Sequence, residues 1–484
     1  MTMLSQLIPD EVLSDDIWIG GITDDSRKFR EGDLFLAMPG INHDGRKYIG
    51  EVADRAAAIL CEPPLPTSAG SVRILPVAGL REKSGAIASR YFGEPSKELT
   101  VFAVTGTNGK TSVANFVANA ANLLGIRCGV VGTLGAGIPD ELDVRLTDGL
   151  TTPVAITLQS ALASIVDQGC AMVALEASSH GLSQRRLNGT SIDIAAFTNL
   201  SRDHLDYHDS MDAYLQSKKQ LLEWPHLKTA IFNADDPYCG AMCRDVSADR
   251  IFYGVTNKAD VVASCIDISD QGVSFKLDSP WGASTVSSNL LGRFNISNLL
   301  ASVCVLGALD YDLDEIANVI GQINNVPGRM QSVRHAEQPL IVIDYAHTPD
   351  ALNQALCSLR EHISGEVWCV FGCGGDRDMG KREEMGEIAS QNADHLILTN
   401  DNPRFENPNN ITNDIIKGIV PGKEYEIELS REVAISRAIR RAGAQDAVLV
   451  AGKGREVYQE VQGEKQACSD FKVVEQCLGI AHLT

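Results

Sequence analysis

The chain has 484 residues, of which 44% are hydrophobic and 22% are charged, and its net charge is −21. This length exceeds one typical hydrophobic core, so we expect several domains, and the composition is typical of a soluble globular protein rather than a disordered one. The negative charge argues against nucleic acid as a partner. We find neither a signal-peptide pattern nor an apolar run of about 18 residues, so we expect a cytoplasmic protein without membrane contact.

The first ninety-two residues predict a small mixed α/β domain. Residues 32–40 have the pattern of a strand that enters a turn, and residues 48–62 that of a helix that runs into a strand. Glycine, proline and charged residues interrupt the periodicity at 93–98, which indicates a domain boundary. We therefore place the first domain at 1–92.

Residues 93–326 predict a second domain with alternating strands and helices. An apolar run at 99–106 ends at glycines, and Val113, Phe116, Val117, Ala120 and Leu124 then form an amphipathic stripe. Short apolar runs separated by helical patterns are typical of a parallel sheet covered on both faces. Residues 260–290 predict antiparallel strands instead.

A second α/β series predicts a third domain at 327–484. We expect strands within 340–347, 366–375, 395–401 and 447–454, and a helix at 430–442 with Ser430 as its N-cap. In open α/β sheets, ligands bind at the carboxyl ends of the strands. The loops after these strands are therefore candidate binding loops.

The glycine loop at 106–111 is the clearest candidate site. A strand, the sequence Gly-x-x-Gly-Lys-Thr and a helix are the context that phosphate binding requires, with Lys110 as the cation and Thr111 as a Mg²⁺ ligand. An ordinary tight turn is the alternative. Residues 256–260 match a guanine-reading motif, but no phosphate-sensing D-x-x-G precedes them, so we interpret them as a turn.

Other polar residues allow two interpretations each. Glu176 ends an apolar strand and is either a Mg²⁺ ligand or an ordinary glutamate at a strand end. His204 and His208 could hold zinc if residues 201–208 were helical, or could simply be polar residues at a helix start. Lys218 would ordinarily be a solvated charge.

Two arginines follow strands of the third domain. Arg377 and Arg404 lie in loops rich in Gly, Asn and Pro, and each could bind a carboxylate with its guanidinium fork. Solvated surface arginines are the alternative. Cysteine pairs at 239/243 and 369/373 lack matching Cys or His partners, so we interpret them as reduced packing residues.

Taken together, the motifs resemble the Mur ligase family, the ATP-dependent amide-bond ligases of peptidoglycan precursor synthesis. The resemblance covers essentially the whole chain and rests on DSR (25–27), LTTP (150–153), LEASSHGLSQRR (175–186), FTNLSRDHLDYH (197–208), GRFNISN (292–298), PGRM (327–330), DYAHTPD (344–350), GGDRDMGKR (374–382) and DNPR (401–404). The shortened glycine loop is the family's normal form. One departure is Arg455, which stands where the family usually has histidine.

The resemblance implies a fold and a set of site residues. The fold is a uridine-binding N-terminal domain, a central P-loop ATPase domain and a Rossmann-like C-terminal domain. The expected ATP-binding residues are Gly106, Thr107, Asn108, Gly109, Lys110, Thr111, Ser112, Asn295, Arg329, Asp344 and His347. The expected catalytic or metal-binding residues are Lys110, Thr111, Glu176, His204 and a carbamylated Lys218. The expected UDP-substrate residues are Ser26, Asn42, His43, Thr151, Thr152, Ser178, Gln184 and Arg186. The expected amino-acid-binding residues are Arg377, Asp401, Asn402, Pro403, Arg404, Gly452 and Glu456.

The resemblance also implies a reaction. ATP and two Mg²⁺ ions serve to join meso-diaminopimelate to UDP-MurNAc-L-Ala-D-Glu through an acyl phosphate, and DNPR marks diaminopimelate rather than lysine. We expect a monomer. The alternatives are a lysine-adding relative, a folate polyglutamate ligase, and a nucleotide-dependent switch that forms no bond.

Overall fold

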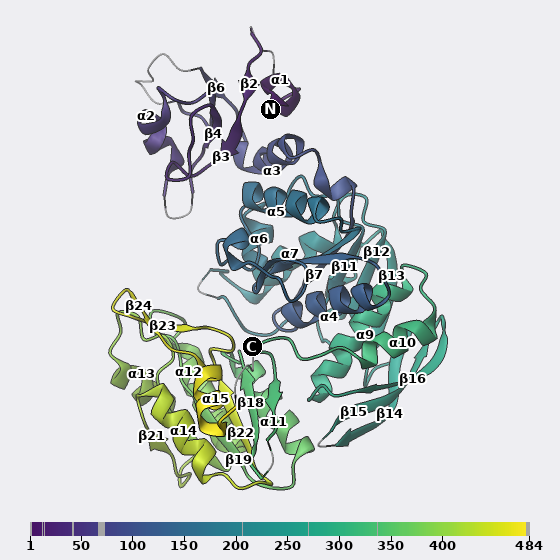
Figure 1. Ribbon diagram of the computed structural model, residues 1–484, viewed down its shortest axis with the longest axis vertical. Helices are drawn as coiled ribbons and strands as arrows, with labels where there is room; N and C mark the ends of the chain where they lie inside the picture. Colours follow the sequence, from purple (N-terminus) through teal and green to yellow (C-terminus); the bar gives the residue numbers. More distant parts are fainter. Residues whose placement is uncertain are drawn as a thin grey trace.

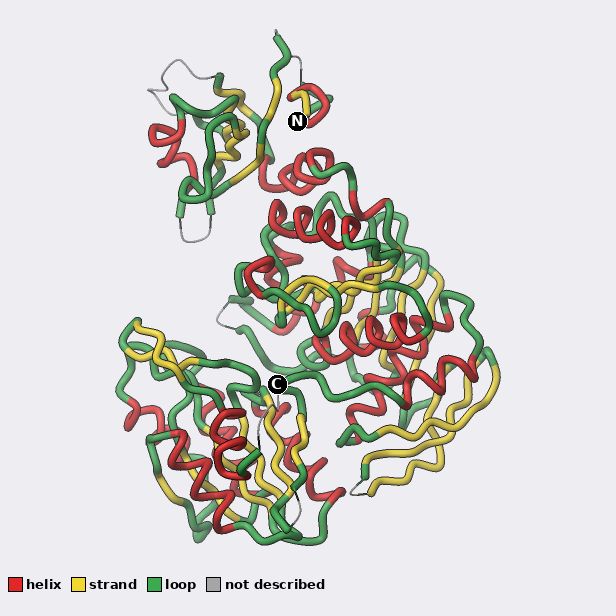
Figure 2. The backbone as a smooth tube through the Cα atoms, in the orientation of Figure 1, coloured by secondary structure: helices red, strands yellow, loops and turns green. Residues whose placement is uncertain are grey.

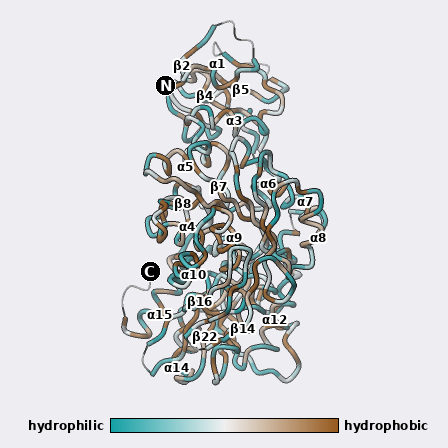
Figure 3. Tube along the Cα trace, turned by 90° about the vertical axis from the view of Figure 1, so that its right-hand side faces the viewer, coloured by the Kyte–Doolittle hydropathy of each residue, from teal (hydrophilic) through white to brown (hydrophobic). Residues whose placement is uncertain are grey.

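The computed structural model describes residues 2–11, 13, 15–40, 43–65, 73–205, 207–269, 271–335 and 337–480. Three α/β parts follow one another along the long axis of the molecule (Figure 1), and the side view in Figure 3 has the same order. Each part is built on its own sheet. The predicted boundaries at 92/93 and 326/327 fall between these sheets and stay predictions.

The N-terminal part has a parallel four-stranded sheet in the order β3-β4-β5-β6. Its elements are β1 (Thr2–Met3), α1 (Leu4–Leu7), β2 (Trp18–Ile19), β3 (Gly21–Thr23), β4 (Asp33–Ala37), η1 (Gly45–Tyr48), α2 (Ile49–Val52), β5 (Ala58–Cys61), β6 (Ile74–Pro76), α3 (Leu80–Tyr91) and η2 (Pro95–Lys97). The strand predicted within 32–40 is confirmed as β4. The helix that runs into a strand, predicted at 48–62, is confirmed as α2 followed by β5.

The central part contains a ten-stranded sheet in the order β16-β15-β14-β13-β12-β11-β7-β10-β8-β9. Its strands are β7 (Thr100–Thr105), β8 (Cys128–Gly132), β9 (Gly135–Gly137), β10 (Met172–Glu176), β11 (Ile194–Phe197), β12 (Thr229–Asn233), β13 (Asp249–Gly254), β14 (Val261–Ser269), β15 (Gly272–Ser279) and β16 (Gly282–Ser288). In this order, the seven neighbouring strands β14-β13-β12-β11-β7-β10-β8 pair in parallel. Strands β9, β15 and β16 are antiparallel to their neighbours. The antiparallel strands predicted at 260–290 are therefore confirmed, and they extend the same sheet.

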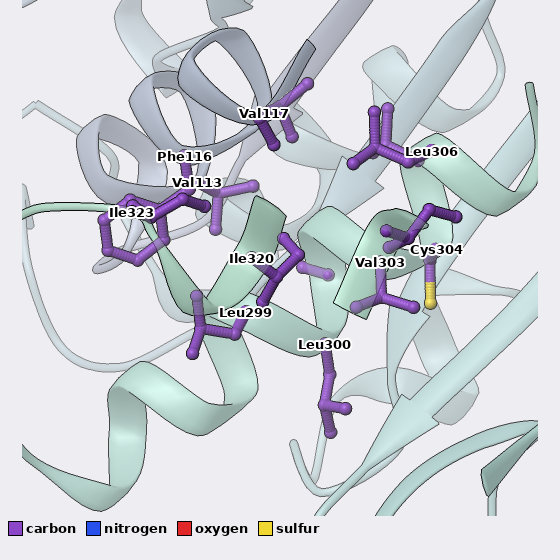
Figure 4. Packing of buried hydrophobic residues seen from close by; sticks show 14 of the residues in the cluster. Val113, Phe116, Val117, Leu299, Leu300, Val303, Cys304, Leu306, Ile320 and Ile323 are labelled. Carbon is purple, nitrogen blue, oxygen red and sulfur yellow. The ribbon is translucent and has the colours of Figure 1, made fainter. Parts of the chain in front are cut away.

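The central helices pack against both faces of this sheet (Figure 2). They are α4 (Lys110–Leu123), η3 (Val144–Thr147), α5 (Ala155–Asp167), α6 (Ser179–Ser183), α7 (Met211–Leu222), α8 (Cys239–Met242), α9 (Arg293–Gly307) and α10 (Leu313–Gly321). The predicted stripe on α4 is buried: Val113, Phe116 and Val117 pack with Leu299 of α9 and Ile320 of α10 (Figure 4). This packing holds the first turn of α4 firmly beside the glycine loop.

The C-terminal part has a six-stranded sheet in the order β17-β18-β22-β19-β20-β21, with only β17 antiparallel among its pairs. Its elements are β17 (Gln331–Val333), β18 (Leu340–Asp344), α11 (Pro349–His362), β19 (Val367–Phe371), α12 (Gly380–Asn392), β20 (His395–Leu398), α13 (Pro408–Ile416), β21 (Glu426–Ile427), α14 (Arg431–Arg441), β22 (Ala447–Ala451), β23 (Tyr458–Val461), β24 (Glu464–Ala467) and α15 (Asp470–Leu478). Ser430 stands at the N-cap of α14 as predicted, but its side chain makes no capping hydrogen bond.

Candidate active site

The glycine loop joins the end of β7 to the start of α4, so the first helical turn begins at Lys110. The free N–H groups and the dipole of such a turn favour an anion. The Lys110 ammonium donates hydrogen bonds of 2.9 Å to the carbonyl oxygens of Gly106 and Thr107. Burial lowers the pKa of Lys110, and the carboxylate of Glu176 partly opposes this shift. The loop therefore has the strand–loop–helix geometry that a phosphate group requires.

The segment that follows β11 holds the loop in place. The backbone N–H of Asn108 donates to Oδ1 of Asn199 at 2.8 Å, and the Thr198 hydroxyl donates to the carbonyl oxygen of Asn108 at 2.6 Å. A Cβ atom at Gly106 would lie 1.9 Å from the Thr198 hydroxyl oxygen. Glycine is thus needed at 106 because two strand ends approach each other closely.

Glu176 is a buried carboxylate beside the loop. Its Oε2 atom accepts hydrogen bonds from the hydroxyls of Thr111 at 2.8 Å and Thr133 at 3.1 Å, and Oε1 accepts one from the Thr133 N–H at 2.8 Å. The Thr133 hydroxyl also lies 3.0 Å from that of Thr151. Glu176 ends strand β10 as predicted, and its buried carboxylate is held within hydrogen-bonding distance of Thr111 in the loop. Sequence reasoning missed Thr133, which carries no motif signal.

A cavity of about 220 Å³ lies between the central and C-terminal parts, with the glycine loop in its wall. Arg329 crosses between the two parts: Nη2 donates to the Thr111 hydroxyl at 3.2 Å, and the guanidinium carbon lies 4.5 Å from the Tyr345 ring centre. The Asn108 side chain donates to Asp350 at 2.9 Å. The cavity brings together all the expected ATP-binding residues except Gly106, namely Thr107, Asn108, Gly109, Lys110, Thr111, Ser112, Asn295, Arg329, Asp344 and His347.

Asp344 and His347 line this cavity from the end of β18. Oδ2 of Asp344 accepts a hydrogen bond from the Met330 N–H at 2.6 Å, and burial raises the pKa of Asp344 against the opposing charge of Arg329. Nδ1 of His347 lies 2.8 Å from the carbonyl oxygen of Tyr345, and burial lowers the pKa of His347. A neutral imidazole suits a site that already holds several cations.

Lys218 on α7 is buried, so its interpretation as a solvated charge is wrong. Its Nζ atom donates to the carbonyl oxygen of Gly106 at 2.6 Å and lies 4.4 Å from the Tyr214 ring centre. Burial, and secondly the Lys110 ammonium, lower the pKa of Lys218 well below its usual value. The amine is therefore biased toward its neutral form.

His204 and His208 do not form a helical zinc pair. None of the described residues from 201 to 210 is helical, and His204 has a left-handed φ of 53°. His204 lines the cavity, and burial lowers its pKa to about 4 although Asp203 opposes the shift. His208 is buried against Tyr214, with ring centres 5.0 Å apart. The two imidazoles therefore have different surroundings.

A larger cleft of about 1500 Å³ is lined by residues from all three parts of the chain. Arg186 is anchored there, because Nη1 donates to the Thr152 carbonyl oxygen at 2.6 Å and Nη2 donates to Gln184 at 2.7 Å. Burial lowers the pKa of Arg186. The expected UDP-substrate residues that line the cleft are Ser26, His43, Gln184 and Arg186.

The other expected UDP-substrate residues lie elsewhere. Thr151 lines the smaller cavity. Thr152 and Ser178 lie beside Glu176, since the Thr152 hydroxyl donates to the Glu176 carbonyl oxygen at 2.7 Å and lies 2.9 Å from the Ser178 hydroxyl. Asn42 lies outside the described residues.

The two predicted arginine loops meet at the carboxyl ends of adjacent strands β19 and β20. A Cβ atom at Gly374 would lie 3.0 Å from Nη1 of Arg404 and 3.8 Å from Cγ of Arg377. Nη1 of Arg404 donates to the Gly375 carbonyl oxygen at 2.7 Å. Arg377 also lines the large cleft. The C-terminal part therefore presents one of its paired arginines to the cleft that the other two parts line.

Lys453 ties together two of the expected amino-acid-binding residues. Its buried ammonium donates to Oε2 of Glu456 at 2.6 Å and to Oδ1 of Asn402 at 3.1 Å, and the Asn402 amide also donates to Glu456 at 2.9 Å. Asp401 lies next to Gly452 across the same loops. Sequence reasoning missed Lys453, although it stands between Gly452 and Glu456, two of the expected amino-acid-binding residues.

Arg382 is a third residue that sequence reasoning missed. Its side chain is fully buried and donates to both carboxylate oxygens of Glu406 at 2.7 Å and to Asp414 at 3.0 Å. It also donates to the Gly374 carbonyl oxygen at 3.3 Å. Arg382 therefore links the loop after β19 to the loop after β20. The neighbouring motif GGDRDMGKR ends on this arginine, which was the available signal.

Within the described parts of the chain, no group of three or more His, Cys, Asp or Glu side chains could hold a metal ion alone. Mg²⁺ is commonly held by one or two carboxylates together with substrate phosphates. Glu176 and Thr111 supply oxygen donors of that kind at the cavity, with His204 nearby. These residues fit a Mg²⁺ ion that arrives with a nucleotide.

This fold and site define a multidomain α/β enzyme of the P-loop, ATP-dependent class. The family model described as "Mur ligase middle domain" matches residues 104–306, and that described as "Mur ligase, glutamate ligase domain" matches residues 328–454. The chain belongs to the Mur ligase family. None of the described helices combines the length and apolar character that crossing a bilayer requires.

Individual relatives extend the similarity over nearly the whole chain. A protein of Ectopseudomonas mendocina named UDP-N-acetylmuramoyl-L-alanyl-D-glutamate–2,6-diaminopimelate ligase is 44% identical, with 97% of this chain and 96% of that protein covered. A Coxiella burnetii protein of the same name is 43% identical, with 98% and 99% covered. A solved structure of a ligase with this name has a TM-score of 0.73 and 37% identity, with 99% of both chains covered.

Proposed function

We propose that this chain is an ATP-dependent ligase that joins meso-diaminopimelate to the D-Glu γ-carboxylate of UDP-MurNAc-L-Ala-D-Glu. The observation that carries the proposal is the position of Arg377, which comes from the C-terminal part yet lines the same cleft as Ser26 and Gln184. An incoming amino acid bound at Arg377 therefore lies beside a substrate bound in the cleft. The names of the relatives support the identity of both reactants.

In the first step the D-Glu γ-carboxylate attacks the γ-phosphorus of ATP, and the bond to ADP breaks to give an acyl phosphate. Both reactants are anions, so the site must offset their repulsion. Lys110 and the N–H groups of the first turn of α4 supply positive charge at the loop. Bound Mg²⁺, of which we propose two ions, supplies further charge stabilisation. Thr111, Glu176, His204 and a modified Lys218 would hold it.

The modification of Lys218 has a chemical basis in its surroundings. A neutral lysine amine adds to CO₂ to form a carbamate, and one proton is released. The lowered pKa of Lys218 favours the neutral amine that this addition requires. The carbamate places an anion beside the Lys110 ammonium, where the unmodified lysine offers only an amine. The carbamate and the Lys110 ammonium then attract each other.

In the second step the amine of diaminopimelate attacks the acyl carbon and phosphate leaves. Arg377 and Arg404 provide guanidinium forks for carboxylates. Glu456 offers a carboxylate for the distal ammonium group, and Lys453 and Asn402 keep it in place. Because the acyl phosphate would react with water, we propose that closure of the C-terminal part over the cleft excludes solvent.

The lysine-adding reaction is the nearest alternative. Lysine differs from diaminopimelate because it lacks the second carboxylate, which the paired arginines suit. An amino-acid panel incubated with ATP and UDP-MurNAc-L-Ala-D-Glu, scored by product mass, tests this choice. We expect a product with meso-diaminopimelate and little with lysine, because a site built for a charged group disfavours an analogue that lacks it. A folate polyglutamate ligase would instead require a folate substrate.

A nucleotide-dependent switch would hydrolyse ATP without forming an amide. Phosphate release therefore separates the classes: a ligase needs both the UDP substrate and the amino acid for turnover. Release with ATP alone at the full rate would contradict the proposed function.

A further inference from the structure

The β23–β24 hairpin holds Arg404 in a fixed conformation. Arg404 has a left-handed φ of 49°, which is unusual for a residue with a side chain. Its N–H donates to the carbonyl oxygen of Glu460 at 2.9 Å, and its carbonyl oxygen accepts from the Gln462 N–H at 2.7 Å. Arg404 also forms an isolated parallel bridge with Val461. The hairpin therefore determines where the guanidinium of Arg404 can reach.

The hairpin also supplies a counter-ion for that guanidinium. Nε of Arg404 lies 3.3 Å from Oε2 of Glu460. Glu460 is itself fixed, because its N–H donates to Oδ1 of Asn402 at 3.0 Å. Nη1 of Arg404 is used by the Gly375 carbonyl oxygen at 2.7 Å. A protein carboxylate thus already engages the Nε edge of Arg404.

We propose that Glu460 is a positioning residue that occupies, in the free enzyme, the edge of Arg404 that a carboxylate of the incoming amino acid takes. The inference rests on the proposed function, since it takes Arg404 as a ligand of that amino acid. A carboxylate that binds must displace Glu460 or share the guanidinium with it. Displacement breaks the ion pair of Glu460 with Arg404, and sharing places two carboxylates beside one cation, so both cases oppose binding.

Glu460 is therefore expected to weaken the binding of an incoming carboxylate at Arg404. Removing the charge of Glu460 relieves the repulsion of an incoming carboxylate and frees the edge of Arg404. The Arg404–Glu460 pair is partly accessible to solvent, with side chains 21% and 34% exposed, so the effect is moderate. We expect a three- to fivefold fall in the KM for meso-diaminopimelate, about the effect of one such partly exposed ion pair.

Glu460→Gln tests the proposal in the full-length enzyme, with Glu464→Gln as the matched control. Glu464 lies on β24 of the same hairpin, is exposed, and faces Val461 rather than Arg404. We expect Glu460→Gln to lower the KM for meso-diaminopimelate while the KM for ATP stays unchanged, and Glu464→Gln to change neither. The control removes the same formal charge, so a general charge effect would lower both.

Glu460→Met removes the same charge with a side chain of similar length. It controls for any new hydrogen bond that the glutamine amide forms. Both variants must lower the KM for the proposal to stand. An unchanged or raised KM with both means that Glu460 merely supports the hairpin, and overturns it. Wild-type enzyme that fails to turn over meso-diaminopimelate at all would instead refute the proposed function, which keeps the two failures distinguishable.

Discussion

The ammonium nitrogen of Lys218 lies 2.6 Å from the carbonyl oxygen of Gly106, so α7 is tied to the first glycine of the phosphate loop. Both Lys218 and Lys110 donate to that one oxygen. Burial, and secondly the neighbouring Lys110 ammonium, lower the pKa of Lys218, because two lysines at one buried carbonyl group are electrostatically costly. Conversion of one lysine to a carbamate removes this cost.

We therefore predict that Lys218→Ala abolishes turnover and that added bicarbonate does not restore it, because no amine remains to be carbamylated. Lys219→Ala is the matched control: Lys219 is the next residue on α7 and pairs with Glu223. Phosphate release in the presence of all three substrates measures the effect. Near-normal activity of Lys218→Ala would remove Lys218 from the mechanism.

Arg404→Ala is expected to raise the KM for meso-diaminopimelate about 10- to 100-fold, the loss typical of one hydrogen bond to a charged group. The KM for ATP should change little, because Arg404 does not line the cavity beside the glycine loop. Arg360→Ala, which removes an exposed arginine paired with Asp394 in the same part of the chain, serves as the control. An unchanged KM would mean that DNPR only forms a turn.

Arg382→Met should lower the free energy of unfolding by about 3 kcal/mol, because it breaks a buried ion pair and strands its partners. Urea denaturation measures this change. Lys417→Met is a matched control, since Lys417 pairs with the same Asp414 from an exposed position and should contribute less than about 1 kcal/mol. Equal decreases in the free energy of unfolding for both variants would show that the buried ion pairs of Arg382 stabilise the fold no more than the exposed pair of Lys417.

The same network predicts a pH dependence. The hydrogen bond from Arg382 holds the pKa of Glu406 below its usual 4.5. A carboxyl group whose folded pKa is depressed contributes stability that is present above the unfolded pKa and lost as pH falls through the folded pKa. Between about pH 5 and 3, around and below the usual glutamate pKa, the free energy of unfolding of the wild type should therefore fall more steeply than that of Arg382→Met. Parallel curves would contradict the prediction.

Gly452→Ala should raise the KM for meso-diaminopimelate. Gly452 has a φ of 112°, and a Cβ atom there would lie 2.6 Å from Oδ2 of Asp401, so the loop must move. Gly422→Ala separates this contact from backbone strain, because Gly422 has a φ of 88° with no atom within 4 Å of its Cβ position. Both variants should lose stability, but only Gly452→Ala should affect the KM.

Local patterns along the chain were enough to predict the strands, the helices and the loops that carry the candidate residues. Alternation of apolar runs and helical stripes predicted α/β parts, because each element must bury one face. The strand, glycine loop and helix around Lys110 are contiguous in the chain, so their geometry follows from local rules. The same holds for the loops that carry Arg377 and Arg404, which follow apolar strands of one sheet.

Contacts between residues far apart in the chain could not be predicted from local patterns. Three such contacts join segments that are distant in the chain: Lys218 with Gly106, Arg329 with Thr111, and Arg404 with Glu460. Such contacts depend on how whole sheets and helices pack, and packing depends on the summed shape of many side chains rather than on any local pattern.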